Sequence, residues 1–193
     1  MATWILDTQQ SVLSFSVKQY LFSSIRGKFE QFEAFVVSKK TDFTDAQVSF
    51  KASVSSLNTH NQDRDKRLQS PEFFDAELFP YITFVSSSFR KIGGTHYQMS
   101  GLLTVRNFQR HIRLDVDFNG FRQDYDQNNY AVFEVVGQLD RKDFGLDSED
   151  LLTLNGMLIG DLVRLQANLV FAKRIAELQS QIFEQFADWQ PRR

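Results

Sequence analysis

The chain has 193 residues with 42% hydrophobic and 24% charged side chains, a composition typical of one globular domain with a sizeable core. Its formal charge is only −2, which argues against a general nucleic-acid-binding protein and against a polybasic membrane-surface protein. The absence of cysteine excludes disulfides, thiol nucleophiles and thiolate metal sites, and the 20 phenylalanines predict an unusually aromatic core.

The N-terminal residues lack the basic and apolar regions of a secretory signal peptide, and residues 4–6 already have the character of a strand. No apolar run approaches the ~18 residues of a membrane-spanning helix, so stable membrane insertion is not expected. We therefore expect a cytoplasmic protein, or a periplasmic one if a leader has been removed.

Apolar and polar residues alternate through most of the chain, which is the pattern of β-strands with one buried face. The alternation is clearest at residues 112–118, where Arg113, Asp115 and Asp117 separate four apolar side chains. In chain order, the predicted strands cover residues 13–17, 25–37, 46–54, 81–85, 97–105, 112–118, 131–139 and 163–171. Polar connections are predicted at residues 90–95 and 122–129.

About eight antiparallel strands with one apolar face can close into a barrel or pack as a two-sheet sandwich. Both arrangements are all-β, and periodicity alone does not choose between them. The choice matters because a sandwich has a solid core, whereas a barrel of this size has room inside for side chains or for one slender ligand.

Two segments depart from the strand pattern. Residues 61–79 are charged and contain Pro71, which predicts a short helical insert. At the C-terminus, apolar residues at spacings of three and four predict an amphipathic helix over about residues 175–190: Ile175, Leu178, Ile182, Phe186 and Trp189. This apolar face is expected to pack on the barrel, to close one mouth or to pair with a second copy in a homodimer.

The sequence offers no catalytic or metal-binding constellation. His60 with Asp63 and Asp65 resembles a site for a hard cation only weakly, because the spacing is unspecific. Residues 124–128 begin like a calcium loop, but the sixth and twelfth positions hold Asn129 and Val135 in place of Gly and Glu. We therefore predict a polar hairpin loop there, with no catalytic residue, metal or cofactor.

A family resemblance rests on six segments, which together span most of the chain. They are WILDTQQSVLSFSV at 4–17, SIRGKF at 24–29, QDRDKRLQSPEFFDAELFPYITF at 62–84, GLLTVRNFQRHIRLDVDFNG at 101–120, LDRKDFGL at 139–146 and IGDLVRLQANLVFAK at 159–173. In content and order these segments resemble the YceI-like family, also called polyisoprenoid-binding proteins. The resemblance covers roughly residues 3–174 and leaves residues 175–190 as a C-terminal helical extension.

The resemblance implies a lipocalin-like, extended antiparallel β-barrel whose elongated apolar pore holds a polyprenyl chain or a similar lipid. Members of the family are thought to bind isoprenoid quinones or their precursors, in storage, transport or metabolism. From the strand alternation, the predicted wall of this lumen is Phe15, Val17, Phe50, Phe84, Met99, Leu103, Val105, Leu114, Val116, Phe118, Phe133, Val135, Leu139, Leu165 and Leu169.

Two pairs of charged residues are candidates for binding a head group at the mouth of the barrel. They are Arg64 with Asp65 and Arg141 with Asp143, and the other interpretation is that they tie loops together. We expect a non-enzymatic protein that binds, stores or transports a polyisoprenoid or another long-chain lipid. The alternatives are an enzyme or accessory factor of isoprenoid or quinone metabolism and a filled barrel that binds a protein partner.

Overall fold

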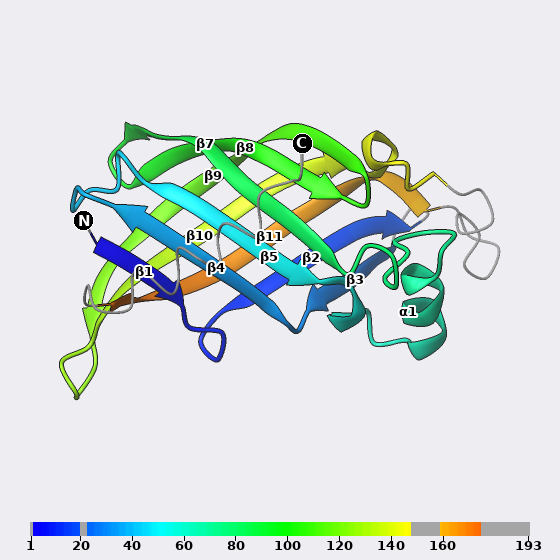
Figure 1. Ribbon diagram of the computed structural model, residues 1–193, viewed down its shortest axis with the longest axis horizontal. Helices are drawn as coiled ribbons and strands as arrows, with labels where there is room; N and C mark the ends of the chain where they lie inside the picture. Colours follow the sequence, from blue (N-terminus) through cyan, green and yellow to red (C-terminus); the bar gives the residue numbers. More distant parts are fainter. Residues whose placement is uncertain (1, 20–22, 148–158, 175–193) are drawn as a thin grey trace.

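The computed structural model describes residues 2–19, 23–147 and 159–174, and these residues contain eleven strands (Figure 1). In chain order the strands are β1 (Ala2–Leu6), β2 (Val12–Gln19), β3 (Ser23–Phe29), β4 (Phe32–Ser38), β5 (Gln47–Ser53), β6 (Leu57–Asn58), β7 (Tyr81–Gly93), β8 (His96–Val105), β9 (Phe108–Gln123), β10 (Asn129–Asp140) and β11 (Ile159–Arg174). The helical elements are α1 (Gln62–Gln69) and two short 3₁₀ turns, η1 (Val54–Ser56) and η2 (Arg141–Phe144).

Eight of the strands form a closed antiparallel ring. Their order is β1–β4–β5–β7–β8–β9–β10–β11, and the ring closes because β1 also pairs with β11. The predicted all-β, lipocalin-like barrel of about eight strands is therefore confirmed, and the sandwich is excluded. Alternation dictates this result: along β9, for example, Leu114 and Val116 are buried inside, whereas Arg113 and Asp115 are exposed outside.

Strand β11 pairs with different partners along its length. Its C-terminal residues 171–174 pair with β1, and its residues 159–168 pair with β2. Beyond β2 the sheet continues through β3 to the short β6. Among the described residues β3 reaches β6 at only two positions, Lys28 and Phe29, so one side of the barrel between β3 and β7 is completed by other elements.

Several predicted boundaries differ from the structure. The predicted strand at 25–37 is two strands, β3 and β4, joined by a tight turn. The predicted connection at 90–95 is shorter, because β7 continues to Gly93 and pairs with β8 as far as His96. The polar residues there satisfy their backbone hydrogen bonds within the hairpin, and this pairing does not require an apolar face.

The predicted helical insert at 61–79 is present as α1 followed by turns. The Asn61 side chain caps the helix by accepting a hydrogen bond from the Arg64 amide at 2.9 Å. In Figure 1, α1 lies at one end of the barrel, and the connection between β4 and β5 lies at the opposite end. The predicted C-terminal helix at 175–190 falls outside the described residues.

Candidate functional site

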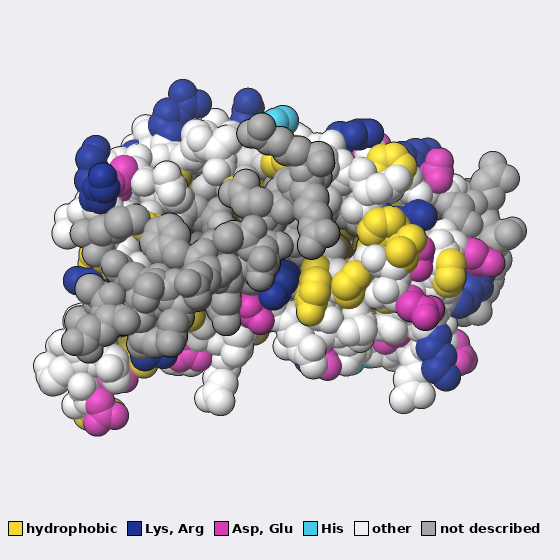
Figure 2. Space-filling model, viewed as in Figure 1, with side chains coloured by type: hydrophobic (Ala, Val, Ile, Leu, Met, Phe, Trp, Pro, Cys, Tyr) yellow, Lys and Arg dark blue, Asp and Glu magenta, His cyan; other side chains and the backbone are white. Residues whose placement is uncertain are grey.

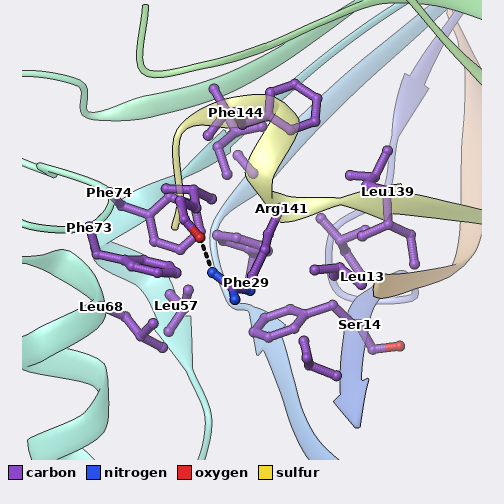
Figure 3. Close-up of a pocket in the computed structure, with 18 of the residues that line it drawn as sticks. Leu13, Ser14, Phe29, Leu57, Leu68, Phe73, Phe74, Leu139, Arg141 and Phe144 are labelled. Atoms are coloured by element: carbon purple, nitrogen blue, oxygen red, sulfur yellow. Dashed lines mark hydrogen bonds between the residues drawn. The ribbon is translucent and has the colours of Figure 1, made fainter. Parts of the chain in front are cut away.

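An apolar chamber of about 180 Å³ lies inside the barrel, at the end covered by α1. Figure 3 shows side chains from α1, from strands and from the η2 turn pointing into the same space. The described strands that contribute to the wall are β2, β3, β5, β6, β7, β8, β10 and β11. The chamber is therefore one part of the lumen, and not a groove on its surface.

The structure places part of the predicted lumen wall around this chamber. These residues come from five strands: Phe15, Val17, Phe50, Leu103, Val105, Leu139 and Leu165. Alternation identified them because each points inward from a strand with one polar face. Whether they touch a ligand stays a prediction.

The remaining predicted wall residues lie elsewhere in the lumen. One group borders a second void of only about 30 Å³ near the other end: Met99, Val116, Phe133, Val135 and Leu169. Phe84, Leu114 and Phe118 line neither space, although they pack within the same hydrophobic core. The resemblance implies one continuous pore. In the structure the lumen is instead a chamber next to a packed region.

The packed region is organised around Phe43, a residue that strand alternation does not single out. Its side chain is only 1% exposed, and its ring meets those of Trp4, Phe118 and Phe133 at centroid distances of 5.5, 5.4 and 5.1 Å. Phe43 has a φ of 58°, which is unfavourable for an aromatic residue and persists only where surrounding contacts fix it. Phe43 therefore fills the β4–β5 end of the barrel, and we call this side chain the stopper.

Polar contacts hold the segment that carries Phe43. The Asp45 carboxylate accepts hydrogen bonds from the Ser38 hydroxyl and from the amides of Lys39 and Lys40. These bonds, that from Ser38 foremost, lower the pKa of Asp45. The Tyr97 hydroxyl donates to the backbone carbonyl of Asp42 at 2.7 Å. A single apolar residue in a polar loop gives no periodic signal, so alternation could not have found this stopper.

The side of the chamber between β3 and β7 is formed by residues outside the barrel ring. It is lined by Leu68 of α1 and by the rings of Phe73 and Phe74 (Figure 3). These two rings pack edge to face at a centroid distance of 5.0 Å. Phe144 and Leu146, at the end of η2, line it as well. The sequence signal for these residues was their apolar character inside otherwise polar segments, but only the tertiary fold shows that they face the lumen.

Arg141 lines the chamber but uses its guanidinium group to join two segments. Its side chain is 6% exposed, and its nitrogens donate to the carbonyls of Gly160 and Leu146 and, at 2.7 Å, to the carboxylate of Asp161. Lys142 contacts the same carboxylate at 2.7 Å. Hydrogen bonding to Lys142 and the charge of Arg141 lower the pKa of Asp161.

Arg64 also lines the chamber and has a comparable structural contact. Its Nε donates to the Thr59 hydroxyl and its Nη2 to the Thr59 carbonyl, both at 2.7 Å, while Asp65 accepts from the Thr59 amide at 2.9 Å. Thr59 is 3% exposed, so these bonds attach α1 to the chain that follows β6. Asp65 and Asp143, the other two head-group candidates, do not line the chamber, and Asp143 is exposed.

The wall of the chamber is an apolar surface. Among its described lining residues the polar side chains are Ser14, Arg64 and Arg141, and each donates hydrogen bonds to other protein groups. Such a wall binds by removing apolar surface from water, and it brings no acid–base pair or nucleophile–base pair together.

The described chain also holds no cluster of three His, Asp or Glu side chains placed to bind a metal ion. The predicted polar loop at 124–128 instead closes the β9–β10 hairpin, because Asp124 accepts hydrogen bonds from Asn128 and Tyr130. Within the described segments, no helix is both long enough and apolar enough to cross a bilayer.

Comparisons with known proteins agree with this architecture. The family profile of the YceI-like domain matches residues 4–171. UPF0312 protein SAS2572 of Staphylococcus aureus is 29% identical over 173 residues, which are 89% of this chain and 98% of that protein.

Two solved structures share the fold. BcnA of Burkholderia cenocepacia superposes with a TM-score of 0.75 at 21% identity, over 86% of this chain and 98% of that one. A polyisoprenoid binding domain from Saccharophagus degradans, implicated in plant cell wall breakdown, has a TM-score of 0.67 at 14% identity, over 89% and 98% of the two chains.

Proposed function

This chain belongs to the YceI-like family, and from that premise we propose that it binds the apolar part of an isoprenoid-type lipid without transforming it. The observation that carries the proposal is the 180 Å³ chamber, whose wall is apolar and whose arginines direct their hydrogen bonds to the protein. Binding of this kind serves storage or transport of the lipid. The Saccharophagus degradans domain, described as polyisoprenoid binding, supports the choice of ligand class.

Burial of carbon is sufficient to drive the binding. Removing a CH₂ group from water contributes about 0.8 kcal/mol, so one five-carbon isoprene unit contributes about 4 kcal/mol before other terms. Loss of translational freedom and ordering of the lipid chain oppose much of this gain. Since the polar groups of the wall are already hydrogen-bonded, discrimination should depend on the size and shape of the apolar part more than on its head group.

The experiment is native mass spectrometry of the purified protein, with organic extraction of lipids that co-purify and with added farnesol as a defined probe. The test variant is Leu165→Asp, which places a carboxylate in the chamber wall, where an unpaired charge is strongly unfavourable. The matched control is Leu162→Asp, the same replacement on the same strand at a position 57% exposed.

We expect the unmodified protein and Leu162→Asp to hold one lipid, and folded Leu165→Asp to hold none. If the charge at position 165 prevents folding, the test variant is Val163→Trp instead, whose large side chain fills part of the chamber. Absence of any lipid on the unmodified protein after addition of the probe would contradict the proposal.

A further inference from the structure

The chamber and the void beside the Phe43 stopper share strands but no lining residue. On β8, Leu103 faces the chamber and Met99 faces the void, and the inward position between them is Gly101. On β10 and β11 the corresponding intermediate positions are Gly137 and Ala167. The boundary therefore falls on small residues, two glycines and one alanine, of three different strands.

Two large side chains from the neighbouring strands occupy the space above the two glycines. Phe84 of β7 lies over Gly101, where an added Cβ would come within 2.5 Å of the Phe84 ring. Leu114 of β9 lies over Gly137 in the same manner. Phe84 is 4% and Leu114 8% exposed, and neither lines the chamber or the void. We call these two side chains the septum.

We propose that the septum of Phe84 and Leu114 limits the length of the bound chain, so that the chamber takes a terminal apolar segment of no more than two isoprene units. This inference deepens the proposed lipid binding and rests on it. An apolar cavity of roughly 150 Å³ holds a benzene molecule, so on that scale the 180 Å³ chamber suits a group of about seven carbons, which is more than one isoprene unit and less than two. The remainder of a longer lipid stays outside the chamber.

The wild-type protein tests the limit directly with prenols of one, two, three and four isoprene units, whose affinities are measured by isothermal titration calorimetry. We expect affinity to rise by about tenfold or more from the first unit to the second, because that unit is buried. From the second unit to the fourth we expect a change below about threefold, since those carbons gain little burial.

A pair of matched variants tests whether the septum causes the limit on chain length. Phe84→Ala removes a ring from the boundary, and Phe133→Ala removes an identical ring, also 4% exposed, from the far side. We expect Phe84→Ala to extend the rise in affinity to the third unit and Phe133→Ala to keep the wild-type limit. If Phe84→Ala does not fold, Leu114→Ala opens the same boundary over Gly137 and is compared with the same control.

The outcomes separate this inference from the function on which it rests. If no prenol binds the wild-type protein, the proposed lipid binding fails. If prenols bind and each of four units adds affinity equally, lipid binding stands and the septum is overturned. Equal chain-length limits in folded Phe84→Ala and Phe133→Ala would likewise overturn the role of Phe84.

Discussion

At the scale of single residues, the Arg141–Asp161 contact explains how a charged side chain is tolerated beside an apolar chamber. The guanidinium group is buried, and its charge is balanced by a carboxylate that is 39% exposed. The pKa of Asp161 is lowered below its ordinary value of about 3.9. A lowered pKa in the folded state means that the carboxylate stabilises the protein above the unfolded pKa, and that this contribution disappears as pH falls through the folded value.

Asp161→Asn should therefore destabilise the protein in a pH-dependent manner. We expect a loss of about 1 kcal/mol at pH 7, modest because Asp161 is partly exposed. The loss should shrink as pH falls below about 4, because the unfolded carboxylate is protonated there first and the folded one only at a lower pH. The measurement is the free energy of unfolding of both proteins in urea at several pH values. Asp143→Asn, an exposed position of η2, is the control, and an Asp161→Asn deficit that is constant with pH would refute the linkage.

Some site residues could be predicted from the sequence and others could not, for physical reasons. Phe15 and Leu165 lie on strands where alternation alone determines which face is inside. Phe73 and Phe144 lie in turns, where direction depends on tertiary contacts. Phe84 followed the alternation too, but its role in the boundary depends on Gly101 of the neighbouring strand, and register is not visible in a single sequence.

At the scale of elements, α1 and the turns that follow it form a part of the chamber wall that is not paired with any strand of the barrel. Cross-strand hydrogen bonds join the strands of the wall into one sheet, whereas α1 is attached by side-chain hydrogen bonds to Thr59 and to the Ser55 carbonyl and by side-chain packing. Hydrophobic side chains also gather at the surface beside α1 (Figure 2). In the chain that follows α1, Leu78 is 68% and Tyr81 49% exposed. Segments with such limited pairing open at lower free energy than the core sheet.

Asn61→Ala should selectively destabilise the part of the chamber wall that α1 forms. Loss of the cap costs about 1 kcal/mol, which corresponds to about fivefold faster amide exchange in α1 and to faster release of bound farnesol. Hydrogen exchange detected by mass spectrometry, together with the release rate, measures both effects. Gln62→Ala in the same helix is the control. Unchanged release despite faster exchange in α1 would show that the lipid leaves by another route.

The elements themselves differed in how well they could be predicted. Strong alternation gave the centres of the strands, and the charged insert correctly indicated α1. The split of residues 25–37 into two strands escaped prediction because Glu30 and Gln31 form a turn without glycine or proline. The segment 39–46 reads as an ordinary polar loop, and its function as a stopper depends on the barrel into which Phe43 inserts.

At the scale of the whole molecule, one closed sheet surrounds both the chamber and the packed end, so binding in the chamber should stabilise the entire described barrel. At a farnesol concentration of 100 times Kd, we expect the free energy of unfolding to rise by about 2.7 kcal/mol. Chemical denaturation with and without farnesol measures the change, and Leu165→Asp should lose it. An unchanged unfolding midpoint at saturation would contradict binding to the native barrel.

The pairing of β1 with β11 also determines when the barrel can form during protein synthesis. Residues 3–6 have their partners at residues 171–174, so the ring cannot close before residues 171–174 have left the ribosome. Until then the inward faces of the earlier strands, rich in phenylalanine, are exposed to water and to other chains. Nascent chains that stop before residue 171 lack this closing pair, and they should depend on chaperones more than the finished protein does.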